Sequence, residues 1–293
     1  MTEQNQLYVL DSFSQKDVVT WKDRHKKIQQ YCWDHYSYFS HHRSLVIDKL
    51  KEALLSSCDA FESSSMHRVV DYGFSDHPLS ATGSIIVDPG GRFNIGDIDG
   101  TKFPRFPALY LAEDVETALR EKFSLSAAKN VDGLSAQQLN LFSSTTTVKV
   151  RCNLKVVLDL RDKQSLRLLF GELKHIQLPH SFIYRAARLK LHPMRAVNTP
   201  EELRETILRQ DWQIMPISFD VPGNSQILGQ LAHAAGVEGI LYPSTKNDKK
   251  NCLAVYPENI KEDSFVEIIG SIPKTTIFRR LDKNTFNDFI RII

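Results

Sequence analysis

Residues 90–123 place an arginine, a tyrosine and a glutamate where they could together hold a charged nucleotide. Arg92 lies in the Gly-rich turn PGGRFNIG, whose glycines allow backbone to approach a ligand without an obstructing Cβ. Its guanidinium presents coplanar N–H donors that can bond two oxygens of one phosphate group. Tyr110 follows on an apolar strand, and Glu121 lies on the next helix. Because a carboxylate beside a bound nucleotide can work on a glycosidic bond, this chemistry is the leading hypothesis.

Each of these residues also has an ordinary structural explanation. The turn matches neither GxGxxG nor GxxxxGK[ST], so it supports neither a Rossmann dinucleotide site nor a P-loop. Arg92 could be an exposed turn residue, and Asn94 could stabilise the turn through its side chain. Tyr110 could belong to the core, and Glu121 could be a solvated or capping carboxylate. Only their combination indicates a site.

Two serines farther along the chain could add polar groups. Ser225 lies near a helix start in PGNSQILG, where a plain helix cap is the alternative explanation. Ser244 follows an apolar strand in YPSTKN, where a serine can donate to phosphate or close a turn. Neither serine has the GxSxG setting of a hydrolase nucleophile.

The composition narrows the class of protein. In 293 residues, 37 Lys and Arg against 35 Asp and Glu leave a net charge of +2, which argues against a general nucleic-acid or membrane-surface binder. The four cysteines form no zinc-type cluster and the early histidines lack metalloprotease spacing, so we expect reduced thiols and no metal. Without a signal peptide pattern or a membrane-length apolar window, we expect a soluble, cytoplasmic protein.

Short β-like runs alternate irregularly with helical ones, which predicts an α+β fold. Strands are expected at 108–112, 147–160, 238–244, 252–256 and 265–270. Helices are expected at about 15–38, 44–58, 114–125, 135–142, 164–173, 200–210, 225–235 and 284–291. The Ser-rich segment 58–65 is typical of a connector. We therefore predict an N-terminal helical extension at 1–62 and a catalytic domain at 63–293, with a basic, helix-rich insert at about 161–215 whose role is unassigned.

The segments GGRFNIG, ALYLAEDVETALREKF and GVEGILYPST, in this order, resemble the RES domain family over roughly residues 66–256. The family is similar in fold to ADP-ribosyltransferases, which implies a mixed β core with surrounding helices. Its characterised members degrade NAD at the nicotinamide ribosyl bond by phosphorolysis or hydrolysis, and many are toxins paired with an Xre-like antitoxin. The resemblance thus implies an NAD-degrading enzyme without a cofactor, with inorganic phosphate as a potential co-substrate and an antitoxin as partner.

Carried over by position, the resemblance also implies roles for the arginines. Arg68 corresponds to the family's early arginine and Arg92 to that of its Gly-rich turn, and both would bind the diphosphate or an incoming phosphate. Asn94, in the same turn, is also expected to bind the substrate. The residue after the early arginine, often aromatic in the family, is Val69 here.

The same comparison implies roles for the remaining candidates. Glu121 would stabilise an oxocarbenium-like ribose, and Tyr110 would pack against the cationic nicotinamide ring. Ser225 is the first candidate for the family serine, bonding the ribose or a phosphate oxygen, and Ser244 is the reserve.

Two other functions stay open. The chain could be an ADP-ribosyltransferase that passes the sugar to a macromolecule, or a non-catalytic interaction module that works through its N-terminal helices. The sequence does not choose between phosphate and water as the acceptor, and a homo-oligomer is left open.

Overall fold

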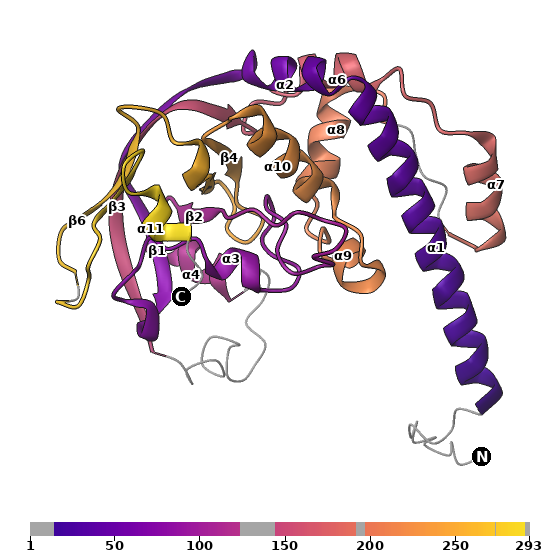
Figure 1. The fold of residues 1–293 in the computed structure, drawn as a ribbon, viewed down its shortest axis with the longest axis horizontal. Helices are drawn as coiled ribbons and strands as arrows, with labels where there is room; N and C mark the ends of the chain where they lie inside the picture. The colour runs from indigo at the N-terminus through magenta and orange to yellow at the C-terminus, as the bar shows by residue number, and fades with distance from the viewer. Residues whose placement is uncertain (1–14, 124–143, 192–196, 273, 291–293) are drawn as a thin grey trace, which may run out of the picture.

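The computed structural model describes residues 15–123, 144–191, 197–272 and 274–290 (Figure 1). The architecture is mixed α+β, as the sequence predicts. Figure 1 shows β1 and β3 as long curved strands at the left, whose upper ends lead to α2 and α6. The predicted helix at 135–142 lies outside the described residues. The finer expectation, an ADP-ribosyltransferase-like fold, stays a prediction.

Seven strands in the described part of the chain form one sheet, in the order β1-β2-β5-β4-β3-β6-β7. They are β1 (Cys58–Asp71), β2 (Leu109–Ala112), β3 (Thr145–Asp159), β4 (Gly239–Pro243), β5 (Asn251–Val255), β6 (Phe265–Ile269) and β7 (Arg280–Asp282). β1 also pairs with β3 along most of its length, antiparallel, from Cys58 opposite Leu158 to Asp71 opposite Thr145. This pairing closes β1, β2, β5, β4 and β3 into a ring, from which β6 and β7 extend.

The helices of the described residues lie mostly above and to the right of β1 and β3 in Figure 1. They are α1 (Gln15–Leu45), α2 (Ile47–Leu55), α3 (Gly83–Ile86), α4 (Val115–Lys122), α6 (Arg167–Leu173), α7 (His180–Arg188), α8 (Pro200–Ile207), α9 (Ile214–Phe219), α10 (Asn224–Ala235) and α11 (Phe286–Ile290). Helix α8 starts at Pro200, as predicted. Thr199 Oγ1 accepts the Glu202 N–H at 3.1 Å and Pro200 occupies the first turn, both of which favour a helix start here. The short helices α3, α7 and α9 were not predicted.

The sheet buries apolar side chains on both faces, and β5 shows how. Cys252 and Ala254 belong to a cluster that contains residues of α2 and α10, whereas Leu253 and Val255 belong to a second cluster that contains Phe289 of α11. Neighbouring residues of a strand point to opposite faces, so a continuous apolar run is what a strand covered on both sides requires.

The segment 58–65 is not a connector, in contrast to our prediction. It is the first half of β1, and Phe61 and Ser63 pair there with Leu154 and Cys152 of β3. The serines suggested a loop, but they also fit a strand with one exposed face. Polar residues can occupy that face, because pairing with β3 satisfies the backbone hydrogen bonds of β1. The predicted domain boundary at 62/63 therefore falls inside a strand.

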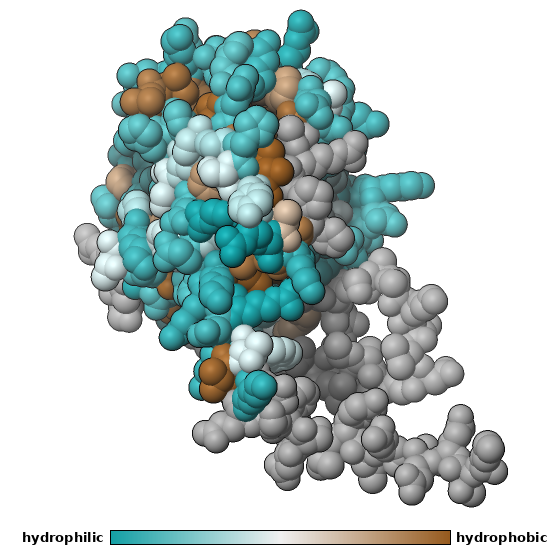
Figure 2. Space-filling view, turned by 90° about the vertical axis from the view of Figure 1, so that its right-hand side faces the viewer, coloured by the Kyte–Doolittle hydropathy of each residue, from teal (hydrophilic) through white to brown (hydrophobic). Residues whose placement is uncertain are grey.

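The N-terminal helices also pack on the remainder of the chain. Leu50 and Leu54 of α2 are fully buried in the same cluster as Leu228 of α10. Helix α1 contacts α7 and α9, with Tyr31 packed near Phe182. The outward face around α1 and α7 is mainly hydrophilic, with apolar residues in small separate groups (Figure 2). Within the described residues, no helix combines the length and apolar character needed to cross a membrane.

Candidate functional site

Glu121 and Ser244, which are far apart in sequence, are joined by a short hydrogen bond. Ser244 Oγ donates to Glu121 Oε1 at 2.5 Å. The same Oγ accepts the backbone N–H groups of Lys246 and Asn247, both at 3.1 Å. Since these two donors occupy the lone pairs of the hydroxyl, its hydrogen is directed at the carboxylate. The loop after β4 thus fixes the end of the Glu121 side chain, which projects from the last turn of α4.

Arg92 reaches the next residue of the same loop. Its Nη2 donates to Thr245 Oγ1 at 3.0 Å, and its Nη1 donates to the carbonyl oxygen of Arg209 at 2.8 Å. The side chain is 6% exposed, so Arg92 is not the exposed turn residue that the local motif alone allowed. Arg92 and Glu121 are therefore held by adjacent residues, Thr245 and Ser244.

Asn94 and Tyr110 hold the Gly-rich turn in place. The fully buried Asn94 accepts through Oδ1 from the N–H of Gly91 at 2.9 Å and from Tyr110 Oη at 2.8 Å, while its Nδ2 donates to two backbone carbonyls. Tyr110 Oη in turn accepts the N–H of Phe93 at 2.9 Å, and burial raises the pKa of Tyr110 above its usual value. A Cβ on Gly91 would lie 2.3 Å from that Oη, which is why glycine is needed here.

Gln226 joins this turn to α10, a role that our sequence reasoning missed. Its Nε2 donates to the carbonyl oxygens of Pro89, Gly91 and Asn94, at 2.9, 3.3 and 3.1 Å. Its Oε1 accepts the N–H of Gly223 at 3.0 Å. A Gln three residues after an N-cap glycine has the spacing of a capping box, and that spacing was a usable signal.

Ser225 makes no such contacts. It is fully buried in the first turn of α10, and its Oγ has no hydrogen-bond partner within the described residues. It is not the helix cap, because Gly223 occupies the N-cap position. The structure therefore brings Ser244, the reserve candidate, into contact with Glu121.

Arg68 lies on β1 with its guanidinium directed toward β2. Nη2 donates to the carbonyl oxygen of Ser80 at 2.6 Å and Nη1 to that of Tyr110 at 3.3 Å. Its buried Nε has no partner among the described residues. Burial lowers the pKa of Arg68 to about 10, so the side chain stays charged at neutral pH.

Comparison with known proteins decides the family. The RES domain family model matches residues 66–273, more than half of the chain. The chain belongs to the RES domain family. None of the curated proteins matches it. Among solved structures, it is similar to a chain of the M. tuberculosis MbcT-MbcA toxin-antitoxin complex, with 16% identity and a TM-score of 0.45, over 83% of this chain and 97% of that one.

The RES domain match includes residues that no local motif identified. Trp212 lies with its ring centroid 5.9 Å from the guanidinium carbon of Arg92. Both Trp212 and Arg209 come from the predicted 161–215 insert, which contributes to the site although its sequence carries no recognisable motif. Asn247 Nδ2 donates to Thr117 Oγ1 at 2.8 Å and so ties the loop after β4 to α4.

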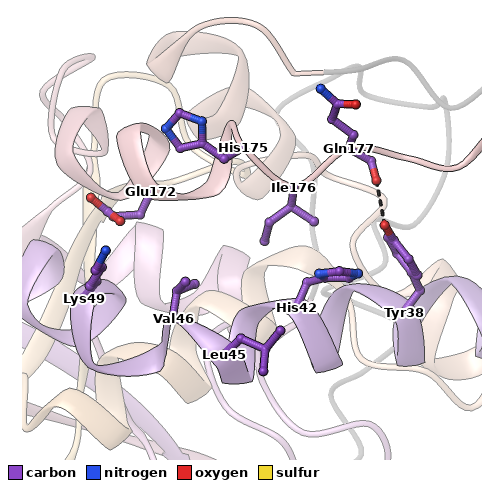
Figure 3. Close-up of a pocket in the computed structure, with 9 residues that line it drawn as sticks. All are labelled: Tyr38, His42, Leu45, Val46, Lys49, Glu172, His175, Ile176 and Gln177. Carbon is purple, nitrogen blue, oxygen red and sulfur yellow. Dashed lines mark hydrogen bonds between the residues drawn. The ribbon is translucent and has the colours of Figure 1, made fainter.

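Two cavities lie elsewhere in this RES domain protein. One of about 450 Å³ lies between the α1–α2 region and the segment from Glu172 to Gln177 (Figure 3). Lys49 and Glu172 are at one end of it, and Tyr38 donates to the carbonyl of Gln177 at the other. A second, of about 180 Å³, is lined by parts of β1, β4 and β5. Neither includes Arg92, Glu121 or Ser244, so the hydrogen-bond network is the stronger guide to the site.

Proposed function

We propose that this RES domain protein degrades NAD by cleaving the bond between nicotinamide and ribose. The supporting observation is that Glu121 and Arg92 are held by Ser244 and Thr245, consecutive residues of one loop. A carboxylate close to a fixed guanidinium suits a substrate in which a ribose adjoins a diphosphate. The resemblance to NAD-degrading family members agrees with this chemistry.

Glu121 acts on the ribose in this proposal. The bond from ribose C1′ to the nicotinamide nitrogen breaks, and its electron pair leaves with nicotinamide, which becomes neutral. The positive charge that develops on the ribose is stabilised by the Glu121 carboxylate. Water or inorganic phosphate then adds to C1′. When water adds, it keeps one proton as the new hydroxyl and releases the other to the solvent. Ser244 bonds Oε1 only, which leaves Oε2 for a ribose hydroxyl.

The arginines bind the phosphates. Within the described residues, two of the five N–H donors of Arg92 have hydrogen-bond partners, and the others suit a phosphate oxygen. The buried Nε of Arg68 is a second donor that a phosphate oxygen would satisfy, and leaving such a group unpaired is costly. Both guanidiniums are preorganised by backbone carbonyls or a hydroxyl, so little freedom is lost on binding.

The residues of the Gly-rich turn have a supporting role. Asn94 uses all its donors and acceptors within the protein, so we propose that it positions the turn and does not contact the substrate. The hydroxyl of Tyr110 is similarly occupied, so the part that Tyr110 offers to a nicotinamide ring is the face of its phenol.

The test is the release of nicotinamide from NAD, with and without phosphate, and with the products identified by mass. ADP-ribose identifies water as the acceptor, and a phosphorylated ADP-ribose identifies phosphate. Glu121→Gln keeps the size of the side chain and removes its charge, so activity should fall by at least about 100-fold. Glu116→Gln, on the same helix but 64% exposed, is the matched control and should keep its activity.

Three results would contradict the proposal. Glu121→Gln could consume NAD as fast as the wild type, which would remove the carboxylate from the mechanism. Label from NAD could accumulate on protein or nucleic acid, as expected of an ADP-ribosyltransferase. Free nicotinamide could stay at background under both conditions, as expected of a non-catalytic interaction module.

We also propose that the protein acts as the toxin of a toxin-antitoxin pair, because many members of the RES family do. Its expression should then deplete cellular NAD and arrest growth, and a cognate Xre-like antitoxin should restore both. Normal growth and NAD levels on expression of the active enzyme would contradict this role.

A further inference from the structure

Residues 209–212, between α8 and α9, lie against the candidate site and are anchored on two sides. The carbonyl of Arg209 accepts from Arg92 at 2.8 Å, and Gln210 Nε2 donates to the carbonyl of Thr245 at 3.3 Å. On the other side, a Cβ on Gly223 would come within 2.6 Å of the Trp212 carbonyl oxygen. Glycine at that position lets the loop lie directly against the start of α10, so the backbone of Trp212 is well fixed.

The indole of Trp212 lies beside the proposed phosphate-binding group. Its ring centroid is 5.9 Å from the guanidinium carbon of Arg92, within the range of a cation–π contact. The residue is only partly buried, unlike the nearly buried Arg92. A flat aromatic surface with some exposure, next to a guanidinium, is a suitable platform for a planar ring.

The site residues form a chain of contacts. Glu121 bonds Ser244, Thr245 is the next residue and bonds Arg92, and Arg92 lies against Trp212. The groups are thus a carboxylate, a guanidinium and an indole. In NAD, the ribose of nicotinamide is followed by the diphosphate and then by adenosine. The two orders correspond.

We propose that Trp212 forms the adenine subsite and stacks on the adenine ring of NAD, an inference that rests on the proposed function. Trp212 then selects for a dinucleotide over a mononucleotide, because a substrate without adenine leaves the indole uncovered. The predicted 161–215 insert thereby acquires a role as one wall of the substrate site.

The experiment measures binding and turnover in the wild type, Trp212→Ala and Trp212→Phe. Calorimetry gives the affinity for ADP-ribose, which contains adenine, and for nicotinamide mononucleotide, which does not. Trp212→Ala should weaken ADP-ribose binding by about 5- to 100-fold and leave the mononucleotide within about twofold. Trp212→Phe, which keeps a smaller ring, should lie between. For NAD, KM should rise by a similar factor while kcat stays within about twofold.

An equal loss for both ligands would overturn the subsite, because it would mean that Trp212 supports Arg92 and not adenine. Unchanged ADP-ribose binding, or a fall in kcat at constant KM, would overturn it as well. Thermal melting checks that the variants fold, and Trp212→Phe keeps the test valid if the alanine variant does not. The proposed function fails separately, if the wild type releases no nicotinamide, and ADP-ribose binding would still test the subsite.

Discussion

Replacing the two candidate serines by alanine, one at a time, tests which of them serves Glu121. Ser244 is 8% exposed and Ser225 fully buried, and each change removes the same hydroxyl oxygen. Their surroundings differ: Ser244 Oγ takes part in three hydrogen bonds, whereas Ser225 Oγ has no partner in the described structure. The pair of variants therefore separates the loss of a hydroxyl from the loss of its contacts.

The contacts set the size of the expected effect. The bond from Ser244 to the Glu121 carboxylate, at 2.5 Å, is of the charge-assisted type that is worth about 1.5–3 kcal/mol. If this bond holds the carboxylate at the ribose, kcat/KM should fall by about 10- to 150-fold in Ser244→Ala. The N–H groups of Lys246 and Asn247 also lose their acceptor, at a cost of about 1–2 kcal/mol of folding free energy. Ser225→Ala loses no hydrogen bond to the described residues, so both quantities should stay close to those of the wild type.

The assay is nicotinamide release from NAD, measured beside urea denaturation of the same preparations. Ser244→Thr, which keeps the hydroxyl, should recover part of the activity. The reasoning is refuted if Ser225→Ala is the more damaged enzyme while its free energy of unfolding is unchanged. That result would make Ser225 the functional serine in spite of its unpartnered position.

Two further predictions concern stability. A Cβ on Gly229 would lie 2.1 Å from the carbonyl oxygen of Phe93, so Gly229→Ala should lower the free energy of unfolding, measured by urea denaturation, by about 1–3 kcal/mol. Gly171 lies in α6 with open space around it, so Gly171→Ala should raise the same free energy by about 0.5–1 kcal/mol. Equal changes in the two variants would contradict the steric argument. Burial lowers the pKa of His35 from 6.5 to about 4. Between these pH values the unfolded chain binds more protons than the folded chain, so the free energy of unfolding should fall as the pH decreases from 6.5 to 4. His35→Phe should flatten the pH dependence of urea denaturation between pH 7 and 5, and an unchanged slope would exclude His35 as its source.

Much of the strand pattern could be predicted from the sequence, because a strand buried on one face alternates apolar and polar residues and a strand covered on both faces is a continuous apolar run. Residues 147–160 mostly alternate and residues 252–256 are a continuous run, and they correspond to β3 and β5. The first half of β1 could not, since its serines are typical of a loop and only the pairing with β3 makes it a strand. Helix α9, with six residues, has too few turns for a clear period. Helix α7 has nine residues and was missed although Phe182 and Ala186, four positions apart, are its buried face.

The candidate site could be predicted where one short motif carried the residue. Arg92 and Glu121 came from a single stretch of sequence and lie at the same loop. The choice between Ser225 and Ser244 could not be made, because it depends on a contact between residues 121 and 244. Trp212 was missed for the same reason: its neighbour, Arg92, is 120 positions away and no spacing rule connects them.

The extent of β1 has a consequence for how the chain holds together. The family match begins at Met66, in the middle of this strand, but the strand starts at Cys58 and follows α2 directly. The part of β1 before Met66 pairs with residues 152–158 of β3, and Leu50 and Leu54 help to fill the space beneath α10. The stretch that the family shares is therefore shorter than the stretch that must fold cooperatively. A fragment cut at the edge of the shared stretch would leave half of β3 as a bare sheet edge, open to pairing with other chains.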